Sequence, residues 1–305
     1  MRDSLVSIAV LHSRIRLGAK RANFRSLKRA IVEISEYQKS RKIDIVVLPP
    51  YPFTGPIIGY YPSHRTNSHI RSNAERLGGS ISPHSVLGSL LWLAANLGIE
   101  IVVGPIVERA GPRLYITAFY VDRLGNITGK YRKIAVTLEE KRNGINPGKD
   151  VGVFTSSSTG AKIGVFVDED LAYPEIFRLI QHKGVNIIIG FMLPYVSEKF
   201  KLIQDSNNML TMENDIIRSF LTVRSRETGV PIVLVGGVVE SISNNMMAYM
   251  DTIPVEPDIG VVDEMVKTVK DVGSLLLIDV DVDHSRPTPI DPKIASMYRK
   301  IAYTR

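Results

Sequence analysis

Short apolar runs typical of β-strands alternate with segments of helical periodicity along most of the chain. The clearest unit is the strand-like run Lys162–Val167, which is followed by a predicted helix from Pro174 to about His182. The runs Ile99–Val107 and Leu114–Val121 instead predict a hairpin around a glycine-containing turn. Because both patterns occur, we predict an α/β fold with mixed sheets and helices outside them. The other predicted strands are Leu5–Leu11, Ile43–Leu48, Ile127–Tyr131, Val185–Gly190, Pro231–Val239 and Ser274–Val282.

No segment rich in glycine, serine or proline divides the chain, and its 305 residues, 44% of them hydrophobic, can bury a large core. We therefore predict a single domain over residues 1–283 and a C-terminal arm over residues 284–305. The amino terminus is typical of a first strand and not of a signal peptide. No apolar run reaches the roughly 18 residues that span a bilayer. We expect no membrane contact.

Two further helices have recognisable ends or periodicity. One is predicted to begin with Ser82 as N-cap and Pro83 in its first turn, and to end at Gly98. Trp92 lies within it, and core packing is the expected role of that side chain. The other runs from about Asp215 to Thr228. The pair Gly236-Gly237 predicts a bulge or a close approach of two backbones.

The chain contains no cysteine, which excludes disulfides, thiolate metal sites and a cysteine nucleophile together. It also has only three glutamines, while lysine and arginine are plentiful. This composition hints at a heat-adapted cytoplasmic protein.

The formal net charge is +7, and residues 14–29 carry seven Lys and Arg residues with no acid. Apolar residues recur at helical spacing through this segment, which predicts an amphipathic helix with a basic outer face. A solvated face is the favoured interpretation, and a patch for nucleic acid or an acidic partner is the alternative. Nucleic acid is an unlikely partner because no groove-reading motif accompanies the charges. The apolar face would contain Phe24, Leu27, Ile31 and Ile34, and the basic face Arg21, Arg25, Lys28 and Arg29.

Three acids, Asp168, Glu169 and Asp170, directly follow the predicted strand Lys162–Val167. The ends of strands are where α/β proteins often hold functional side chains. Capping and solvation before the helix at Pro174 is the favoured interpretation of Glu169 and Asp170, because acids suit a helix N-terminus. An oxygen-ligand site for Mg²⁺ or Mn²⁺ is a disfavoured alternative.

Three segments together resemble the carbon–nitrogen hydrolase (nitrilase/amidase) superfamily. They are residues 44–55 (DIVVLPPYPFTG), residues 101–134 and residues 162–190. The run Gly129–Lys133 is the most specific element, and the resemblance extends from Ser7 to about Val282. It implies a four-layer α-β-β-α sandwich.

The resemblance also implies a cysteine nucleophile, a glutamate general base and a lysine that stabilises the tetrahedral intermediate. A thiolate attacks the nitrile or amide carbon, a carboxylate moves the proton, and a cation offsets the oxyanion. The lysine position is occupied by Lys133, and a supporting glutamate position by Glu140. The base position is occupied by Pro50, which has no ionisable group, and the nucleophile position by Asp168. Two of the three catalytic roles are therefore replaced.

Two smaller departures concern the pocket. Ile116 stands where the family commonly has asparagine, and residues 56–85 form a longer insertion than usual. That insertion contains Tyr60, Tyr61, His64 and His69, and we expect it to reshape or cover the pocket.

These observations favour a catalytically silent member that binds a small molecule or assembles with another subunit. The alternative is a divergent amidohydrolase acting on non-peptide C–N bonds through Asp168, Lys133 and Glu140. No cofactor and no metal are implied. The resemblance implies at least a homodimer, with C2 symmetry as the default, formed through the helices 174–182 and 215–228 and through the C-terminal arm.

Overall fold

The computed structural model describes residues 5–37, 41–61, 63–194, 199–204, 209–241, 246–282 and 293. Its strands form three hydrogen-bonded sheets. The first has the order β17 (Ser274–Asp281), β1 (Leu5–His12), β3 (Ile45–Val47), β4 (Glu100–Ala110), β5 (Arg113–Val121) and β6 (Ile127–Arg132). The second has the order β16 (Gly260–Val261), β15 (Ile253–Glu256), β12 (Ile232–Val235), β9 (Ile187–Phe191), β8 (Lys162–Val167) and β7 (Gly152–Thr155).

Both large sheets combine parallel and antiparallel pairs. In the first sheet β1, β3 and β4 are parallel neighbours, while β4, β5 and β6 form antiparallel hairpins. In the second sheet β8, β9 and β12 are parallel, and the flanking strands are antiparallel. The predicted mixed α/β architecture is therefore confirmed.

A third, smaller sheet joins the two halves at one end of the molecule. It has the order β10 (Leu202–Gln204), β11 (Met209–Met212), β14 (Met246–Met250), β13 (Gly237–Ser241) and β2 (Arg14–Arg16). Its strands β2 and β13 pair in parallel, and each directly follows a strand of one large sheet, β1 and β12 respectively.

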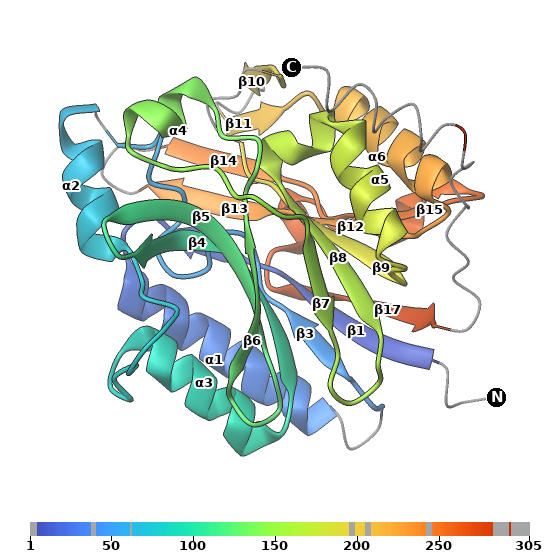
Figure 1. The fold of residues 1–305 in the computed structure, drawn as a ribbon, viewed down its shortest axis with the longest axis horizontal. Coiled ribbons are helices and arrows are strands. Elements are labelled where there is room, and N and C mark those ends of the chain that lie inside the picture. Colours follow the sequence, from blue (N-terminus) through green and yellow to red (C-terminus); the bar gives the residue numbers. More distant parts are fainter. Residues whose placement is uncertain are drawn as a thin grey trace.

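Helices cover the outer faces of the two large sheets (Figure 1). On the first sheet lie α1 (Lys20–Tyr37) and α3 (Val86–Leu97), whose buried apolar residues share one core with β1, β3, β4 and β5. On the second lie α5 (Pro174–His182) and α6 (Asn214–Thr228), which contact β8 and β12. A larger core fills the space between the sheets. These layers are the predicted α-β-β-α sandwich.

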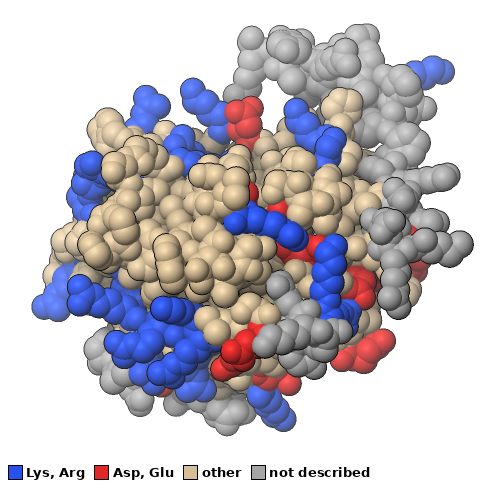
Figure 2. Space-filling view, turned by 90° about the horizontal axis from the view of Figure 1, so that it is seen from below, with Lys and Arg blue, Asp and Glu red and all other residues tan. Residues whose placement is uncertain are grey.

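The basic segment divides between a strand and a helix. The prediction of a helix from residue 14 is wrong, because Arg14–Arg16 form β2 and α1 begins at Lys20. By contrast, β8 and α5 have the predicted bounds. Pairing of β2 with β13, more than 200 residues later, overrides local helical periodicity. The basic outer face of α1 is confirmed: Figure 2, seen from the side where α1 lies, shows Lys and Arg gathered beside a broad uncharged area. Its exposed cations are Arg21, Arg25, Lys28 and Arg29.

Two predictions about α3 need correction. Its N-cap is Ser85 and not Ser82, because the Ser85 hydroxyl accepts from the N–H of Gly88 at 2.9 Å. Trp92 is 58% exposed and not in the core, because the face of α3 that meets the sheet carries Leu87, Leu90 and Ala94. The helix ends at Gly98, as predicted. A short helix in the insertion, α2 (Ser63–Asn73), was not evident from the sequence pattern.

The glycine pair divides one predicted strand into two. Residues 231–239 contain β12 and the start of β13, which belong to different sheets. A Cβ on Gly236 would lie 2.0 Å from the carbonyl oxygen of Met250, so the predicted close backbone approach is confirmed. Among the described residues, no helix is long and apolar enough to cross a membrane. The predicted arm, residues 284–305, lies outside the described residues apart from Lys293.

Candidate functional site

Lys133, Glu140 and Asp168 lie together in the interior, between the two large sheets. The Lys133 ammonium Nζ is 2.8 Å from Oε1 of Glu140 and 3.7 Å from Oδ2 of Asp168. Lys133 and Glu140 are 0% exposed, and Asp168 is 4% exposed. A buried cation therefore contacts two buried carboxylates, at three positions that the sequence singles out.

The Glu140 carboxylate is positioned by local hydrogen bonds in addition to its contact with Lys133. Glu140 lies in the short helix α4 (Leu138–Arg142), whose N-cap is Thr137. The Thr137 hydroxyl accepts from the Glu140 N–H at 3.1 Å, and Glu140 Oε2 accepts from the Thr137 N–H at 2.7 Å. This reciprocal capping box occupies one carboxylate oxygen and leaves the other for Lys133.

Asp168 stands at a sharp change of backbone direction. β8 ends at Val167, and residues 168–172 form the 3₁₀ turn η1. Asp168 has φ +46° and Tyr51 has φ +49°, and among the described residues no other non-glycine residue has a positive φ. Such backbone costs about 1–3 kcal/mol per residue and clusters at functional sites. The two strained residues touch, because the Tyr51 hydroxyl donates to Asp168 Oδ2 at 3.2 Å.

Tyr51 is a site residue that the sequence patterns do not single out. Its only signal is its place directly after Leu48-Pro49-Pro50 at the end of β3. Pro50 itself is buried and offers no side-chain donor or acceptor. The loop is seated on β4: the Tyr51 N–H donates to the Pro105 carbonyl at 3.0 Å, and a Cβ on Gly104 would lie 2.2 Å from the Pro49 carbonyl oxygen.

Burial and charge act in opposite directions on Asp168. Burial raises its pKa, which the Lys133 ammonium and the Tyr51 hydrogen bond lower only in part, and the result is a pKa of about 7. For Lys133 burial lowers the pKa, but the charges of Asp168 and Glu140 outweigh this and raise it above the ordinary value. Lys133 is therefore the permanent charge of the cluster, and Asp168 changes charge near neutral pH.

Glu169 is 3% exposed and is therefore not the solvated acid that the sequence predicts. Asp170 corrects the same expectation. It is 0% exposed, and its carboxylate accepts from the Tyr131 hydroxyl at 2.6 Å and from the Val167 N–H at 2.9 Å. The N–H groups of Ile134 and Ala135 donate to its other oxygen. Asp170 therefore ties the segment after β6, which carries Lys133, to the turn that carries Asp168.

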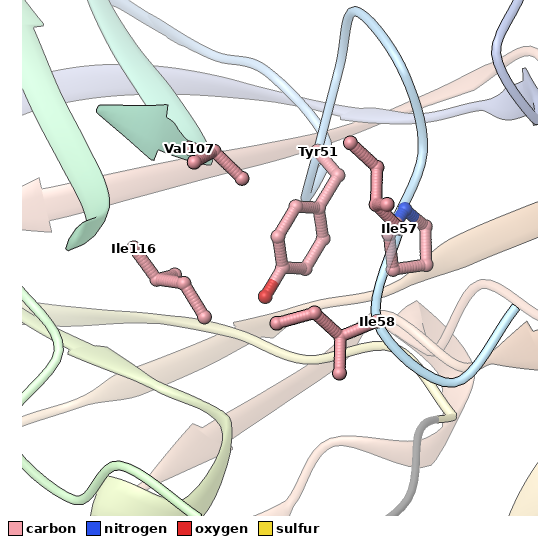
Figure 3. Close-up of a pocket in the computed structure, with 6 residues that line it drawn as sticks. Tyr51, Ile57, Ile58, Val107 and Ile116 are labelled. Carbon is pink, nitrogen blue, oxygen red and sulfur yellow. The ribbon is translucent and has the colours of Figure 1, made fainter. Parts of the chain in front are cut away.

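A small apolar cavity of about 10 Å³ adjoins the cluster. Figure 3 shows the Tyr51 ring between the strand residues Val107 and Ile116 and the loop residues Ile57 and Ile58. A cavity of this size holds about one water molecule. Ile116, at the position of the family's asparagine, contributes an apolar wall.

The insertion covers the cluster, as predicted. Ile57, Ile58 and Tyr60 are buried, and the Tyr60 hydroxyl donates to the Pro194 carbonyl. Burial, and then the negative charge of Asp168, raise the pKa of Tyr60 above its ordinary value. His64 and His69 lie on α2 and not in a loop, and neither lines the cavity.

The oxygen-ligand alternative finds no support. Within the described ranges, no group of three or more His, Asp or Glu side chains is arranged to hold a metal ion. The Lys133 ammonium lies between Glu140 and Asp168, and repulsion from it would oppose a metal cation there.

The protein is an α-β-β-α sandwich with a buried Lys–Glu–Asp cluster in its interior. The carbon-nitrogen hydrolase family model matches residues 7–289, and the chain belongs to this family. The described chain resembles a branch 10 member of the nitrilase superfamily from Saccharomyces cerevisiae, with a TM-score of 0.68, 18% identity and coverage of 99% and 95% of the two chains.

An amidase from Nesterenkonia sp. AN1 has the same fold, with a TM-score of 0.69, 17% identity and coverage of 98% of each chain. That structure is of a mutant of the amidase, and it shows the acetamide moiety of fluoroacetamide added covalently at the active-site cysteine. In sequence the chain is 28% identical to a probable nitrilase of Schizosaccharomyces pombe over 99 residues, which are 32% of this chain and 35% of the relative. A second curated relative, a hydrolase in the agr operon of Staphylococcus lugdunensis, is 26% identical over 96 residues, 31% of this chain. The matches span 35% and 41% of the lengths of these two relatives.

Proposed function

We propose that this protein is a catalytically silent member of the carbon–nitrogen hydrolase family, which serves as a binding or assembly protein. The observation that carries the proposal is the Asp168 carboxylate, held by Lys133 and Tyr51 at the end of β8, in a chain without cysteine. The position that would present a thiolate to a substrate presents a buried carboxylate, whose Oδ2 is engaged by a cation and a hydroxyl and whose Oδ1 has no hydrogen-bond partner among the described residues.

Three features of the cluster support the absence of catalytic activity. A carboxylate is a far weaker nucleophile toward amides than a thiolate. Pro50, at the base position, cannot accept a proton, and Glu140 is committed to Lys133 and to the cap of α4. The space beside Tyr51, about 10 Å³, is also too small for an amide substrate. Lys133 and Glu140 act as a buried ion pair that holds the segment after β6 to α4.

Turnover assays separate this proposal from the divergent amidohydrolase. We expect no turnover of a panel of amides, nitriles and carbamoyl compounds by the wild-type protein. Turnover that is abolished by Asp168→Asn and by Lys133→Ala, but not by the exposed Asp150→Asn, would show that the cluster is catalytic and would overturn the silent assignment.

Restoring the two missing groups tests which part of the machinery was lost. We expect Asp168→Cys combined with Pro50→Glu to give measurable amide hydrolysis only if the covering loop is also opened, for example by Ile57→Gly with Ile58→Gly. The reason is that the loop residues fill the space a substrate would need. Activity in the two-residue variant alone would indicate that the pocket opens in solution. The lack of activity in the wild type would then result only from the replaced catalytic residues.

We further propose that the protein forms a homodimer through α5 and α6. Three apolar side chains on these helices are open to solvent: Leu179 is 55% exposed, Ile216 is 39% exposed and Val223 is 49% exposed. The neighbouring Ile176 and Ile180 face the chain's own sheet. Exposed apolar material on two adjacent helices is typical of a contact surface.

Light scattering after size exclusion is expected to give about twice the chain mass of 33.9 kDa. Leu179→Asp combined with Val223→Asp should shift the protein to the monomer mass, because two charges would be buried at the interface. Leu124→Asp is the matched control, since Leu124 is 78% exposed in the turn before β6. A wild-type monomer, or equal dissociation by the control, would contradict this surface.

A further inference from the structure

An open cleft of about 430 Å³ lies on the outer side of the first sheet, separate from the buried cluster. It is formed by the segment after α2, the turn between β4 and β5, and the strand β6. Its volume falls within the range of small-molecule sites. The cleft is lined by Arg76, Leu77, Gly78, Glu108, Arg109, Ala110, Gly111, Lys130 and Arg132.

The cleft and the buried cluster use opposite faces of the same strands. Val107 pairs with Ile116 and lines the small cavity, whereas the next pair, Glu108 with Tyr115, faces the other way. Lys130 and Arg132 of β6 line the cleft, while Lys133 turns inward to Asp168. Binding of a ligand in the cleft is therefore independent of whether the buried cluster is catalytically active.

One cation of the cleft is held rigidly. The Arg132 guanidinium donates from Nε and Nη2 to the two oxygens of Glu108, at 2.8 Å and 3.0 Å. Its Cζ lies 3.9 Å from the centre of the Tyr115 ring. Glu108 is itself fixed, because it is 2% exposed and accepts from the Thr117 hydroxyl at 2.8 Å. Arg132 keeps three of its five N–H donors for another partner, in an orientation set before binding.

The cations of the cleft outnumber its carboxylates, because Lys130 shares Glu108 with Arg132, its Nζ lying 3.7 Å from Oε1 of Glu108. Glu108 is the one carboxylate that lines the cleft, against Arg76, Arg109, Lys130 and Arg132, which leaves three net positive charges. Arg76 has no ion-pair partner among the described residues, and Arg109 donates to the backbone carbonyl of Arg71. Gly78 and Gly111 add no side chains to the rim, so the charges remain accessible.

We propose that this cleft binds the diphosphate group of a small molecule. Guanidinium groups match the geometry of phosphate oxygens in paired hydrogen bonds, and three positive charges balance the two or three charges of a diphosphate. The preset Arg132 lowers the ordering cost of binding. The sequence alone gives no sign of this site, because its cations come from three segments that are distant along the chain.

Calorimetric titration of the full chain with pyrophosphate, ADP, adenosine and citrate in 150 mM salt tests the proposal. Pyrophosphate and ADP are expected to bind at one site per chain, and adenosine is expected not to bind. Arg76→Gln combined with Lys130→Gln should weaken both at least tenfold. Both side chains are exposed, so an unchanged melting temperature should accompany the loss.

The matched control removes two charges from the basic face of α1, by Arg21→Gln combined with Lys28→Gln, and should leave both affinities within twofold. No binding of pyrophosphate, or equal weakening by the two double variants, would overturn the cleft as a site. Equal affinity for citrate would overturn the assignment to phosphate. Binding of pyrophosphate but not ADP would identify the inorganic ion as the ligand. Tighter binding of ADP than of pyrophosphate would identify the ligand as a nucleotide.

Discussion

Replacing Lys133 with methionine is expected to lower the free energy of unfolding at pH 7 by about 3–5 kcal/mol. Methionine nearly preserves the volume of the side chain, so the loss comes from charge and not from a cavity. Without the ammonium, the buried Glu140 carboxylate loses the partner of Oε1, and Asp168 loses the cation 3.7 Å away. Urea unfolding followed by circular dichroism measures the change.

Lys130→Met is the matched control for this substitution. Lys130 lies on β6, three residues before Lys133, which follows the end of that strand. The Lys130 side chain is exposed on the outer face, and its Nζ is 3.7 Å from Oε1 of Glu108. We expect it to change stability by less than about 1 kcal/mol. A loss of similar size in both variants would show that Lys133 contributes only general packing and that the buried ion pair is unimportant.

Asp168→Asn is expected to stabilise the protein above pH 7. The folded carboxyl keeps its proton to a pKa of about 7, whereas the unfolded one ionises near its ordinary value of 3.8. Between these values the folded state binds more protons than the unfolded state, so wild-type stability falls as pH rises. At pH 8 the accumulated cost is about 4 kcal/mol, and asparagine avoids it. Asparagine also tolerates the positive φ at this position.

The measurement is the difference in unfolding free energy between variant and wild type at several values from pH 4 to pH 8. This difference should grow from near zero at pH 4 to its maximum near pH 7. The other titrating groups are the same in both proteins, so their contributions cancel in the difference. Asp150→Asn, at an exposed position, should give a flat difference. A flat difference for Asp168→Asn as well would mean that Asp168 ionises normally and that Lys133 fully offsets its burial.

The sandwich was predictable because its elements carry local signals. The strand and helix on either side of Asp168 have the bounds that apolar periodicity and Pro174 predict. Predictions failed where distant pairing decides the conformation. Arg14–Arg16 become a strand only because β13 lies beside them, and the face that Trp92 occupies on α3 depends on how that helix meets the sheet.

The three charged residues of the candidate site were predictable from the sequence, but the residues that contact them were not. Lys133, Glu140 and Asp168 could be placed because the resemblance fixes them relative to short motifs. Tyr51 could not, since its contact with Asp168 crosses 117 positions of the sequence and depends on an uncommon backbone angle. Asp170 was misjudged because acids before a helix are usually hydrated, whereas here four donors from the neighbouring segments enclose the carboxylate.

The left-handed backbone of residue 168 limits which amino acids natural variation can place there. Glycine fits this angle at little cost, and aspartate and asparagine adopt it more readily than other residues, whereas β-branched residues are strongly disfavoured. Among close homologues we therefore expect a narrow set of small residues at this position. Such a pattern would show that the backbone bend, and not the chemistry of the side chain, restricts this position.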